Sequence, residues 1–217
     1  MKDLAKRFLS KSDRDDIITA VKEAEEFTAG EIVPMVVSAS YHYPMADVVG
    51  AAALAFPVSL MLAPLVGGWL WIGTGSMWLF LGFFTVLFIA FHEIVKRSLW
   101  LKRLFISQQE IDEEVEEAAV SGFYGEGLYR TRDETGVLIF ISVFEHKVRI
   151  LADRGINEKV EQGCWEDVVK DIVDSIKHKR QAQGICEAVK KVGELIRVHF
   201  PVQPDDTDEL NNLIVKE

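Results

Sequence analysis

One uninterrupted apolar stretch constrains the fold of this chain more than any other feature. Residues 48–91 contain no Lys, Arg, Asp, Glu or His, although charged residues make up 27% of the 217-residue sequence. A helix needs about 20 apolar residues to cross a hydrocarbon core of about 30 Å. The stretch is long enough for two such helices, and glycines at 67–68 and the run from Gly73 to Ser76 break it. The sequence therefore predicts a transmembrane helical hairpin, with spans at about 48–68 and 76–95.

The alternative is a buried helical pair inside a soluble protein. The length and the lack of charge argue against that alternative, and tryptophans gather where the ends of the spans meet the membrane interface: Trp69, Trp71 and Trp78. Pro57 and Pro64 lie inside the first span, where membrane helices tolerate proline. No charged residue marks an intramembrane pathway, which disfavours a third interpretation, a transporter or channel subunit.

Basic residues beside the second span set the predicted orientation. Lys96, Arg97, Lys102 and Arg103 follow it directly, whereas the turn between the spans carries no positive charge. Lys and Arg near span ends favour the cytoplasmic side. Residues 1–30 also lack the apolar core of a secretory signal. We therefore expect a multi-pass protein of the cell inner (plasma) membrane, with the lipid bilayer as a partner and both termini in the cytoplasm.

The hairpin, residues 46–97, separates two parts of one soluble α/β domain, residues 1–45 and 98–217. Hydrophobic periodicity of 3.6 indicates helices, and short β-branched or apolar runs indicate strands. The expected strands are 31–40, 136–143 and 148–153, and the expected helices are 13–28, 108–120, 165–179 and 184–200. This order predicts a mixed-sheet α/β/α sandwich with an irregular acidic tail after Pro201.

Local signals refine three of these elements. Ser12 and Asp13 are plausible N-cap residues for the first helix, and Gly30 follows it as a stop. Pro34 inside the first strand suggests an edge strand or a bulge, because proline cannot donate to the ladder. The glycine-containing run 122–127 precedes a strand and opens no helix, so it is interpreted as a flexible loop and not a phosphate loop.

Composition and motifs exclude several classes of function. The net charge of −10 argues against nucleic acid as a partner, because phosphate binding relies on clustered Lys and Arg. The two cysteines, Cys164 and Cys186, form no zinc-ligand spacing and are expected to be buried thiols in a reduced compartment. His92-Glu93 lacks the second histidine of a zinc protease motif. No Walker A loop, dinucleotide fingerprint or nucleophile elbow is present.

Carboxylates near strand ends are the candidate ligands. Asp133 and Glu134 precede one predicted strand, and Asp153 ends the next. Ligands of α/β sheets gather where loops leave strand ends, and Ca²⁺ or Mg²⁺ prefers oxygen ligands. Asp153 is therefore a candidate metal ligand, and the favoured alternative is that it caps the turn ADRGI, in which Gly155 supplies a permissive conformation. The acidic residues at 205–209 are either a solvated tail or a second cation-binding segment.

Several of these segments resemble the TPM domain family. The resemblance is carried by the run Ala29-Gly30-Glu31-Ile32 after a helix containing AEE, and by residues 135–156, most strongly at VRILADRGI. Trp165, Gly184 and the HFP sequence at 199–201 are similar to one bacterial branch. The resemblance implies a mixed sheet between helices, with the family's acidic site at Asp153. Family members have been linked to phosphatase activity, calcium binding, photosystem repair and receptor scaffolding.

Two departures from the usual membrane-linked member bear on function. This chain has no signal sequence, and its hairpin lies inside the domain. Because no nucleophile–base pair is recognisable, we expect a non-enzymatic binding or scaffolding module at the cytoplasmic face of the membrane, with another membrane protein as its partner. The alternative is a divalent-metal-dependent phosphatase with its ion near Asp153.

Overall fold

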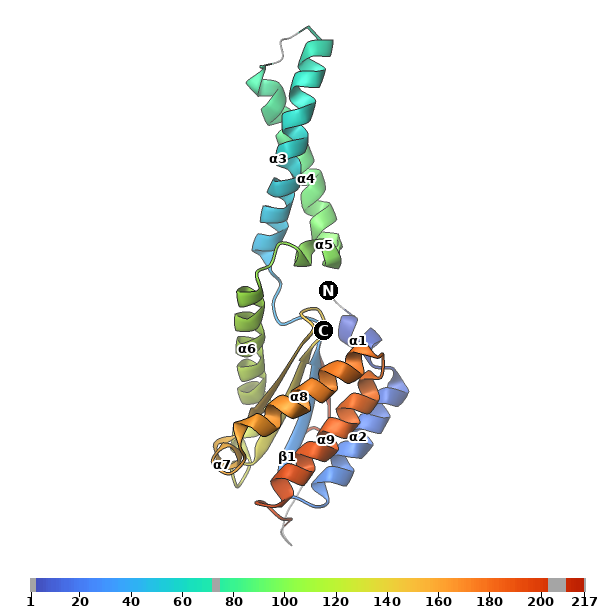
Figure 1. Ribbon diagram of the computed structural model, residues 1–217, viewed down its shortest axis with the longest axis vertical. Coiled ribbons are helices and arrows are strands. Elements are labelled where there is room, and N and C mark those ends of the chain that lie inside the picture. The colour runs from blue at the N-terminus through green and yellow to red at the C-terminus, as the bar shows by residue number, and fades with distance from the viewer. Residues whose placement is uncertain (1–2, 72–74, 203–209, 217) are drawn as a thin grey trace. The chain divides into compact units, whose positions relative to one another are not determined.

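The computed structural model describes residues 3–71, 75–202 and 210–216. Its elements, in chain order, are α1 Leu4–Phe8, α2 Lys11–Glu25, β1 Glu31–Val37, α3 Pro44–Trp69, α4 Met77–Arg97, α5 Leu99–Arg103, α6 Gln108–Gly125, η1 Leu128–Arg130, β2 Gly136–Ser142, β3 Lys147–Ala152, α7 Arg154–Asn157, α8 Gln162–Lys177, α9 Gln181–Arg197 and β4 Ile214–Lys216. Figure 1 labels most of them along the ribbon.

The chain divides into two compact units. Residues 1–41 and 112–217 form the first, and residues 42–111 form the second. The first unit holds the sheet and the helices that cover it. The second consists of the long helices α3 and α4, the short helix α5 and the start of α6.

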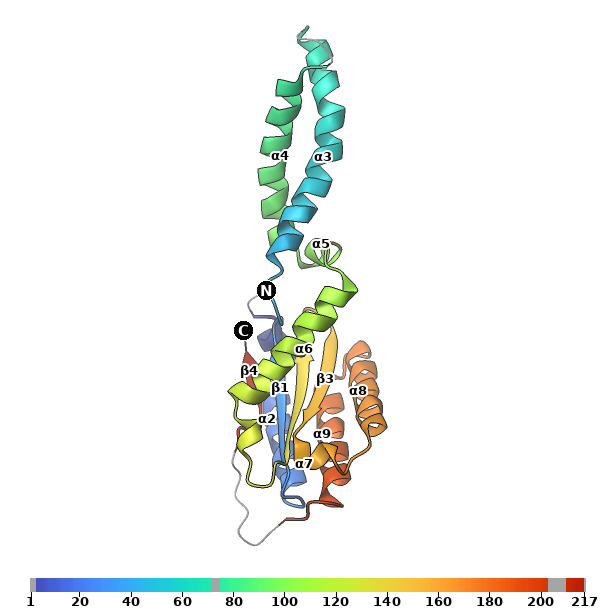
Figure 2. The same cartoon turned by 90° about the vertical axis from the view of Figure 1, so that its left-hand side faces the viewer.

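The first unit is the predicted α/β/α sandwich, so the expected fold class is confirmed. Its four strands follow the order β3-β2-β1-β4. β1 runs parallel to both β2 and β4, whereas β3 runs antiparallel to β2 (Figure 2). The sheet is therefore mixed, and β2 and β3 form the hairpin that the sequence predicts.

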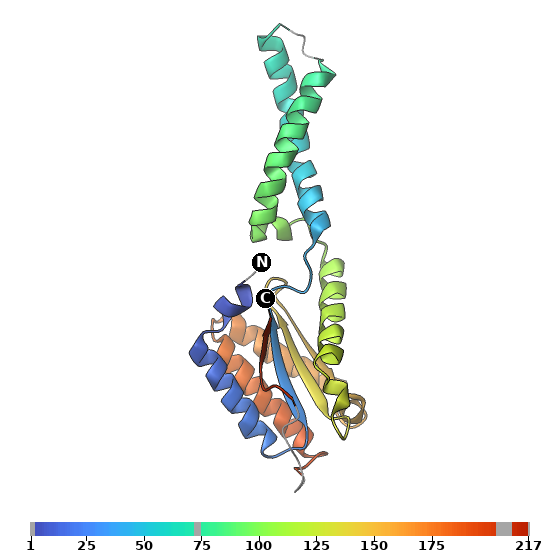
Figure 3. The ribbon, with the colours of Figure 1, turned by 180° about the vertical axis from the view of Figure 1, so that it is seen from behind.

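Helices cover the two faces of the sheet unequally. α2, α8 and α9 lie on one face, and α6 lies alone on the other (Figures 1 and 3). The three-helix side holds the main core, where apolar side chains of α9 pack against both strands and helices: Ile185, Ala188, Val189, Val192 and Ile196. A single helix covers only part of a four-stranded sheet, and this leaves space on the α6 face.

β1 lies inside the sheet, although Pro34 suggested an edge or a bulge. β4 pairs only with Met35–Val37. Upstream of that pairing, the N–H of Ile32 donates instead to Glu25 Oε1 at 2.9 Å. Glu31 N bonds to Thr135 O beside β2, so the backbone N–H and C=O groups of odd-numbered residues of β1 point toward β2. Those of even-numbered residues therefore point toward β4. The missing N–H of Pro34 therefore faces a stretch that β4 does not reach, and costs no ladder bond.

Three local expectations are corrected by the structure. α2 begins two residues earlier than expected, because Ser10 is its N-cap residue and forms a capping box with Asp13, and it ends at Glu25, well before Gly30. α6 continues to Gly125, so four of the six residues of the expected glycine loop are helical. Residues 214–216 form strand β4 at the end of a tail that was expected to be irregular.

The second unit contains two helices that are long and apolar enough to cross a membrane. In their most apolar windows, 28% of α3 and 6% of α4 is buried, whereas a core helix of a soluble protein would be mostly buried. Phe80, Phe84 and Phe88 stack along one side of α4, and Phe56 of α3 meets Phe80 edge-on with ring centroids 5.9 Å apart. The two helices therefore pack against each other and leave most of their surface uncovered.

A buried ion pair joins the beginning of α3 to α5 within this unit. Lys102 Nζ lies 3.1 Å from Asp47 Oδ2 and also donates to the carbonyl oxygen of His42. Lys102 and Asp47 are only 4% and 8% exposed. Lys102 was expected to act as a cytoplasmic flanking charge, and in the structure it holds the base of the hairpin together.

Candidate functional site

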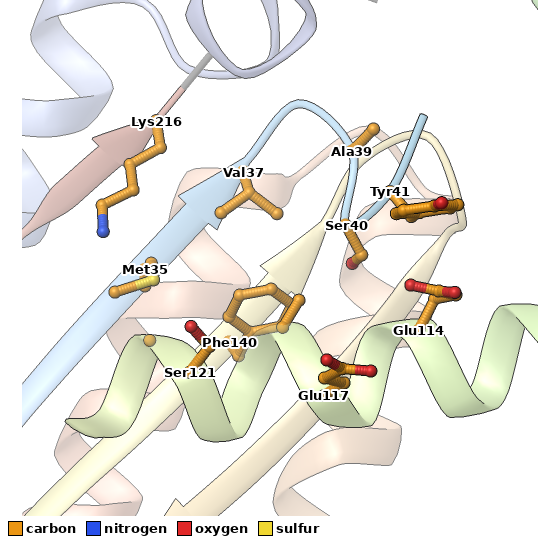
Figure 4. Close-up of a pocket in the computed structure, with 12 residues that line it drawn as sticks. Met35, Val37, Ala39, Ser40, Tyr41, Glu114, Glu117, Ser121, Phe140 and Lys216 are labelled. Atoms are coloured by element: carbon orange, nitrogen blue, oxygen red, sulfur yellow. The ribbon is translucent and has the colours of Figure 1, made fainter. Parts of the chain in front are cut away.

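The carboxyl ends of the three parallel strands meet at one edge of the sheet. Val37 ends β1, Ser142 ends β2 and Lys216 ends β4. Open α/β sheets bind ligands at this edge. A pocket of about 600 Å³ lies there on the face that α6 covers (Figure 4). Met35, Val37 and Phe140 supply its apolar lining.

Polar side chains from three segments line the rest of the pocket. α6 contributes Glu114, Glu117 and Ser121, the loop after β1 contributes Ser40 and Tyr41, and β4 contributes Lys216. In Figure 4, the carboxylates of Glu114 and Glu117 rise from α6 toward the loop after β1. The pocket thus combines an apolar strand surface with hydroxyl and carboxylate groups along α6 and the loop.

The structure shows whether two of these polar groups, Lys216 and Ser40, are paired. Lys216 Nζ forms an ion pair with Glu126 Oε1 at 2.5 Å, which fixes the ammonium group beside the end of α6. The hydroxyl of Ser40 is buried and has no hydrogen-bond partner within the described ranges. Buried polar atoms are nearly always paired in native proteins, so the Ser40 hydroxyl is a point where a bound polar group would be stabilised.

A buried glutamate holds the loop that carries Ser40. Glu145 is fully buried in the β2–β3 connection. Its Oε1 accepts a hydrogen bond from Ser40 N at 2.9 Å, and its Oε2 accepts one from the Ser142 hydroxyl. Hydrogen bonds to a charged group are worth about 1.5–3 kcal/mol each. Glu145 therefore positions one wall of the pocket without lining it.

An ion-pair cluster fixes α6 over the strands. Lys147 Nζ lies 2.7 Å from Asp112 Oδ1, and Arg149 contacts Asp112 and Glu116 at 3.6 and 3.3 Å. The hydrogen bond from Lys147 lowers the pKa of Asp112 below its ordinary value. These ion pairs therefore link α6 to β3.

The lining of the pocket combines apolar, hydroxyl and carboxylate groups with one cation. Its twelve lining residues include no His, Cys or Asp, and its one cation is already paired. Nucleophilic catalysis needs a nucleophile activated by a neighbouring base, and no such pair is present among these residues. Hydroxyl, carboxylate and apolar groups together suit a polar segment of a larger partner.

Asp153 lies at the opposite end of the strands from the pocket, beside the beginning of β2. Because β3 is antiparallel, its last residues lie beside the beginning of β2, and Asp153 N donates to Gly136 O at 2.8 Å. Asp153 is the N-cap residue of α7, and its Oδ1 accepts from Arg154 N at 2.7 Å. Its Oδ2 is buried and has no partner in the described part of the chain. The turn-capping alternative is thus present in the structure, and metal binding at Asp153 stays a prediction.

The other predicted carboxylates do not complete a ligand set around Asp153. The main-chain oxygens of Asp133 and Glu134 approach Gly155, so the loops before β2 and after β3 are neighbours. However, residues 3–71, 75–202 and 210–216 contain no group of three or more His, Cys, Asp or Glu side chains that could hold a metal ion. The acidic cluster at 205–209 lies outside the described residues. Glu93 pairs with Arg97 at 3.3 Å on α4.

Sequence reasoning missed Ser40, Glu145 and Lys216. They lie far apart in the chain, and they approach one another only because parallel strands end at the same edge. The one available signal was Glu145, a charged residue in the short connection between two apolar strands. Burial of β2 and β3 also buries this connection.

Comparison with known proteins agrees with this architecture. The profile of the TPM domain family matches residues 103–195, a range that includes VRILADRGI. A solved structure, the NMR structure of BA42 protein from the psychrophilic bacterium Bizionia argentinensis, is similar with a TM-score of 0.59 and 21% identity over 97% of this chain and 96% of that chain. At this identity the similarity concerns the fold. No curated protein matches the chain.

Proposed function

Because this chain contains a TPM domain, we propose that it is a membrane-anchored binding module. The hairpin of α3 and α4 inserts into the plasma membrane, and both termini and the TPM domain lie at its cytoplasmic face. The domain holds another membrane protein and catalyses no reaction.

The outward-facing apolar surface of α3 and α4 carries this proposal. Large apolar side chains in the middle of both helices are more than half exposed: Phe56, Leu60, Met61, Leu65, Val86 and Ile89. Soluble proteins rarely expose continuous apolar patches of this kind, whereas lipid chains solvate them. The charged residues of this hairpin lie at its ends, at Asp47 and from Glu93 to Arg97, as the membrane interface requires.

The binding role is supported by the pocket at the carboxyl edge of the sheet. It offers an apolar lining, an unpaired hydroxyl at Ser40 and two carboxylates on α6. It lacks an activated nucleophile, so recognition is the function that its residues favour.

Membrane fractionation of the full-length chain tests the anchoring. Leu60→Glu combined with Val86→Glu places two charges in the middle of the hairpin, where each costs about 2–4 kcal/mol or more in lipid. Val198→Glu is the matched control, because Val198 is 73% exposed in the other unit. We expect wild type and control to stay in carbonate-washed membranes, and the double variant to leave them. Retention of the double variant, or a soluble wild type, would contradict the proposal.

The unpaired Oδ2 of Asp153 keeps one alternative function open, a divalent-metal-dependent phosphatase. The described residues do not supply the set of side-chain ligands that such a site needs. Asp153→Ser removes the carboxylate but keeps an N-cap oxygen, whereas Asp153→Ala removes both. Phosphate release that requires Ca²⁺ or Mg²⁺ and is lost in Asp153→Ser would favour the phosphatase. No release by the wild type, together with lower stability only in Asp153→Ala, would favour the capping role.

A further inference from the structure

A groove runs between the edge strand β3 and helix α8, on the sheet face opposite α6. Two adjoining hollows of about 440 and 490 Å³ share Val148, Val173 and Lys177 in their walls. We call this continuous space the β3–α8 groove. Its apolar lining comes from both elements: Val148, Ile150, Trp165, Val169, Val173 and Ile176. Val169, Val173 and Ile176 are only half-buried, so the groove offers apolar surface to a ligand.

The backbone of β3 also offers unused hydrogen-bonding groups along this groove. Asp153 N bonds to Gly136 O, and hydrogen-bonded pairs alternate along an antiparallel ladder. The register therefore directs the backbone groups of Lys147, Arg149 and Leu151 toward β2. Those of Val148 and Ile150 point away from the sheet, and no strand among the described residues pairs with them. Further along, Asn157 Nδ2 donates a hydrogen bond to the carbonyl oxygen of Ala152 at 2.6 Å, so that oxygen is already paired.

The outward backbone groups and the groove-facing side chains belong to the same residues. Val148 is 4% exposed and Ile150 packs against the core on the α8 side. A strand added beside β3 pairs with Val148 and Ile150, and its side chains at the paired positions lie on the same face as theirs. They therefore meet Val169 and Val173 of α8. The geometry selects an extended chain with apolar side chains at alternate positions.

The remaining positions of an added strand face basic side chains. Lys147 and Arg149 lie on the other face of β3, and their side chains are 30% and 37% exposed. Opposite charges on neighbouring strands stabilise a sheet by about 0.2–1 kcal/mol per pair. Acidic side chains between the apolar positions are complementary to this edge, even though Asp112 and Glu116 already contact the same cations from α6.

The wall of the groove contains one further unsatisfied group. The indole N–H of Trp165 is buried without an acceptor in the described part of the chain, and Trp165 is 8% exposed. Buried donors are nearly always paired. A carbonyl group of a chain seated in the groove is the kind of acceptor that this donor lacks.

We propose that the β3–α8 groove binds an extended segment of another protein by strand addition to β3. The segment places apolar side chains against α8 and acidic side chains beside Lys147 and Arg149. Main-chain hydrogen bonds to Val148 and Ile150 supply affinity, and the alternating side chains supply specificity. This inference rests on the proposed binding function and names the chemical class of its partner.

Fluorescence anisotropy tests the proposal with the full-length chain in detergent micelles. The probe is a fluorescein-labelled peptide, Ser-Val-Glu-Val-Glu-Val-Ser, which carries the predicted alternation. Ile150→Pro and Ile150→Ala form the critical pair, because both shorten the side chain but only proline removes the outward N–H. The β2–β3 ladder does not use that N–H, so proline is tolerated at such an edge, and a thermal melt of each variant checks this.

We expect saturable binding of the probe by wild type and by Ile150→Ala. Loss of one hydrogen bond of about 1 kcal/mol makes Ile150→Pro bind at least about 5-fold more weakly than Ile150→Ala. Val173→Asp weakens binding about 10-fold or more, whereas Val198→Asp leaves it unchanged. A peptide with Lys in place of Glu binds more weakly than the probe. Equal binding by the Pro and Ala variants would overturn strand addition, and equal binding of the two peptides would overturn the acidic preference.

Absence of saturable binding up to about 1 mM probe would overturn the proposal as a whole. The outcome is separable from membrane anchoring, because binding is measured in micelles and anchoring by fractionation. A chain that stays in the membrane but binds no probe refutes only the groove. A chain that binds the probe but does not insert refutes only the anchor.

Discussion

Glu145 should decide whether the loop after β1 is ordered. It is fully buried, and its carboxylate accepts hydrogen bonds from Ser40 N and from the hydroxyl of Ser142. Glu145→Ala leaves the buried hydroxyl of Ser142 and the part-buried N–H of Ser40 without this acceptor, at about 1–3 kcal/mol each. Glu145→Gln keeps the shape, because the amide oxygen can still accept from Ser40 N and the amide nitrogen can donate to Ser142 Oγ. We expect the free energy of unfolding to fall by about 2–6 kcal/mol in the alanine variant and by much less in the glutamine variant.

Amide hydrogen exchange of the full-length chain measures this effect locally. A loss of 1–3 kcal/mol at Ser40 corresponds to about 5- to 150-fold faster exchange for a peptide that covers residues 37–43. The helical core at residues 185–196 serves as the internal reference. Unchanged exchange of residues 37–43 in Glu145→Ala would show that this carboxylate does not hold the wall of the pocket.

Four further predictions follow from buried contacts and titrating groups. Lys102→Met leaves the buried carboxylate of Asp47 unpaired, so it should lower the free energy of unfolding by about 3–5 kcal/mol, measured with denaturant in detergent. Adding Asp47→Leu should recover most of that loss. A double variant that is no more stable than the single one would refute the pairing argument. Gly184→Ala places a Cβ 2.4 Å from Ser175 Cβ where α8 and α9 meet, so it should lower the free energy of unfolding by about 1–3 kcal/mol and be rescued by Ser175→Gly. Gly163→Ala, with open space around it, should not be destabilising. The hydrogen bond from Lys147 lowers the pKa of Asp112, so this pairing stabilises the fold above the ordinary carboxyl pKa and is lost as pH falls through the lowered value. Asp112→Asn should therefore flatten the acid limb of a pH–stability curve below the ordinary carboxyl pKa, and an unchanged limb would contradict this. Burial, and next the charge of Asp16, raises the pKa of the Cys186 thiol, so Cys186 should react with maleimide more slowly than a free cysteine at about pH 8, and an equal rate would contradict the assigned protonation.

The sequence was sufficient for features that depend on local periodicity. A period of 3.6 in the expected helix 184–200 places Ile185, Val189 and Val192 on one face, and all three are fully buried. An almost continuously apolar run such as 136–143 is typical of a strand covered on both faces, and every residue of β2 is buried. These outcomes follow from the spacing of apolar residues, which the chain carries locally.

Features that depend on strand direction could not be read from the sequence. Asp153 was considered a ligand because it ends a strand, but β3 is antiparallel and places it away from the carboxyl edge of β1 and β2. β4 was missed because three residues near the end of an acidic tail carry no strand signal. The pairing of β4 with Met35–Val37 brings Lys216 to the pocket, and no local pattern predicts that contact.

The central proposal is that the α3–α4 hairpin spans a membrane while the α/β domain stays in the cytoplasm. Cysteine accessibility tests it in cells, with Cys164→Ser and Cys186→Ser as background and a membrane-impermeant maleimide as reagent. Gly75→Cys reports the turn of the hairpin and Gly163→Cys the start of α8, and both glycines have open space for a side chain. We predict that Gly75→Cys is labelled in intact cells and Gly163→Cys only after permeabilisation. Labelling of Gly163→Cys in intact cells, or protection of both positions until lysis, would contradict the account.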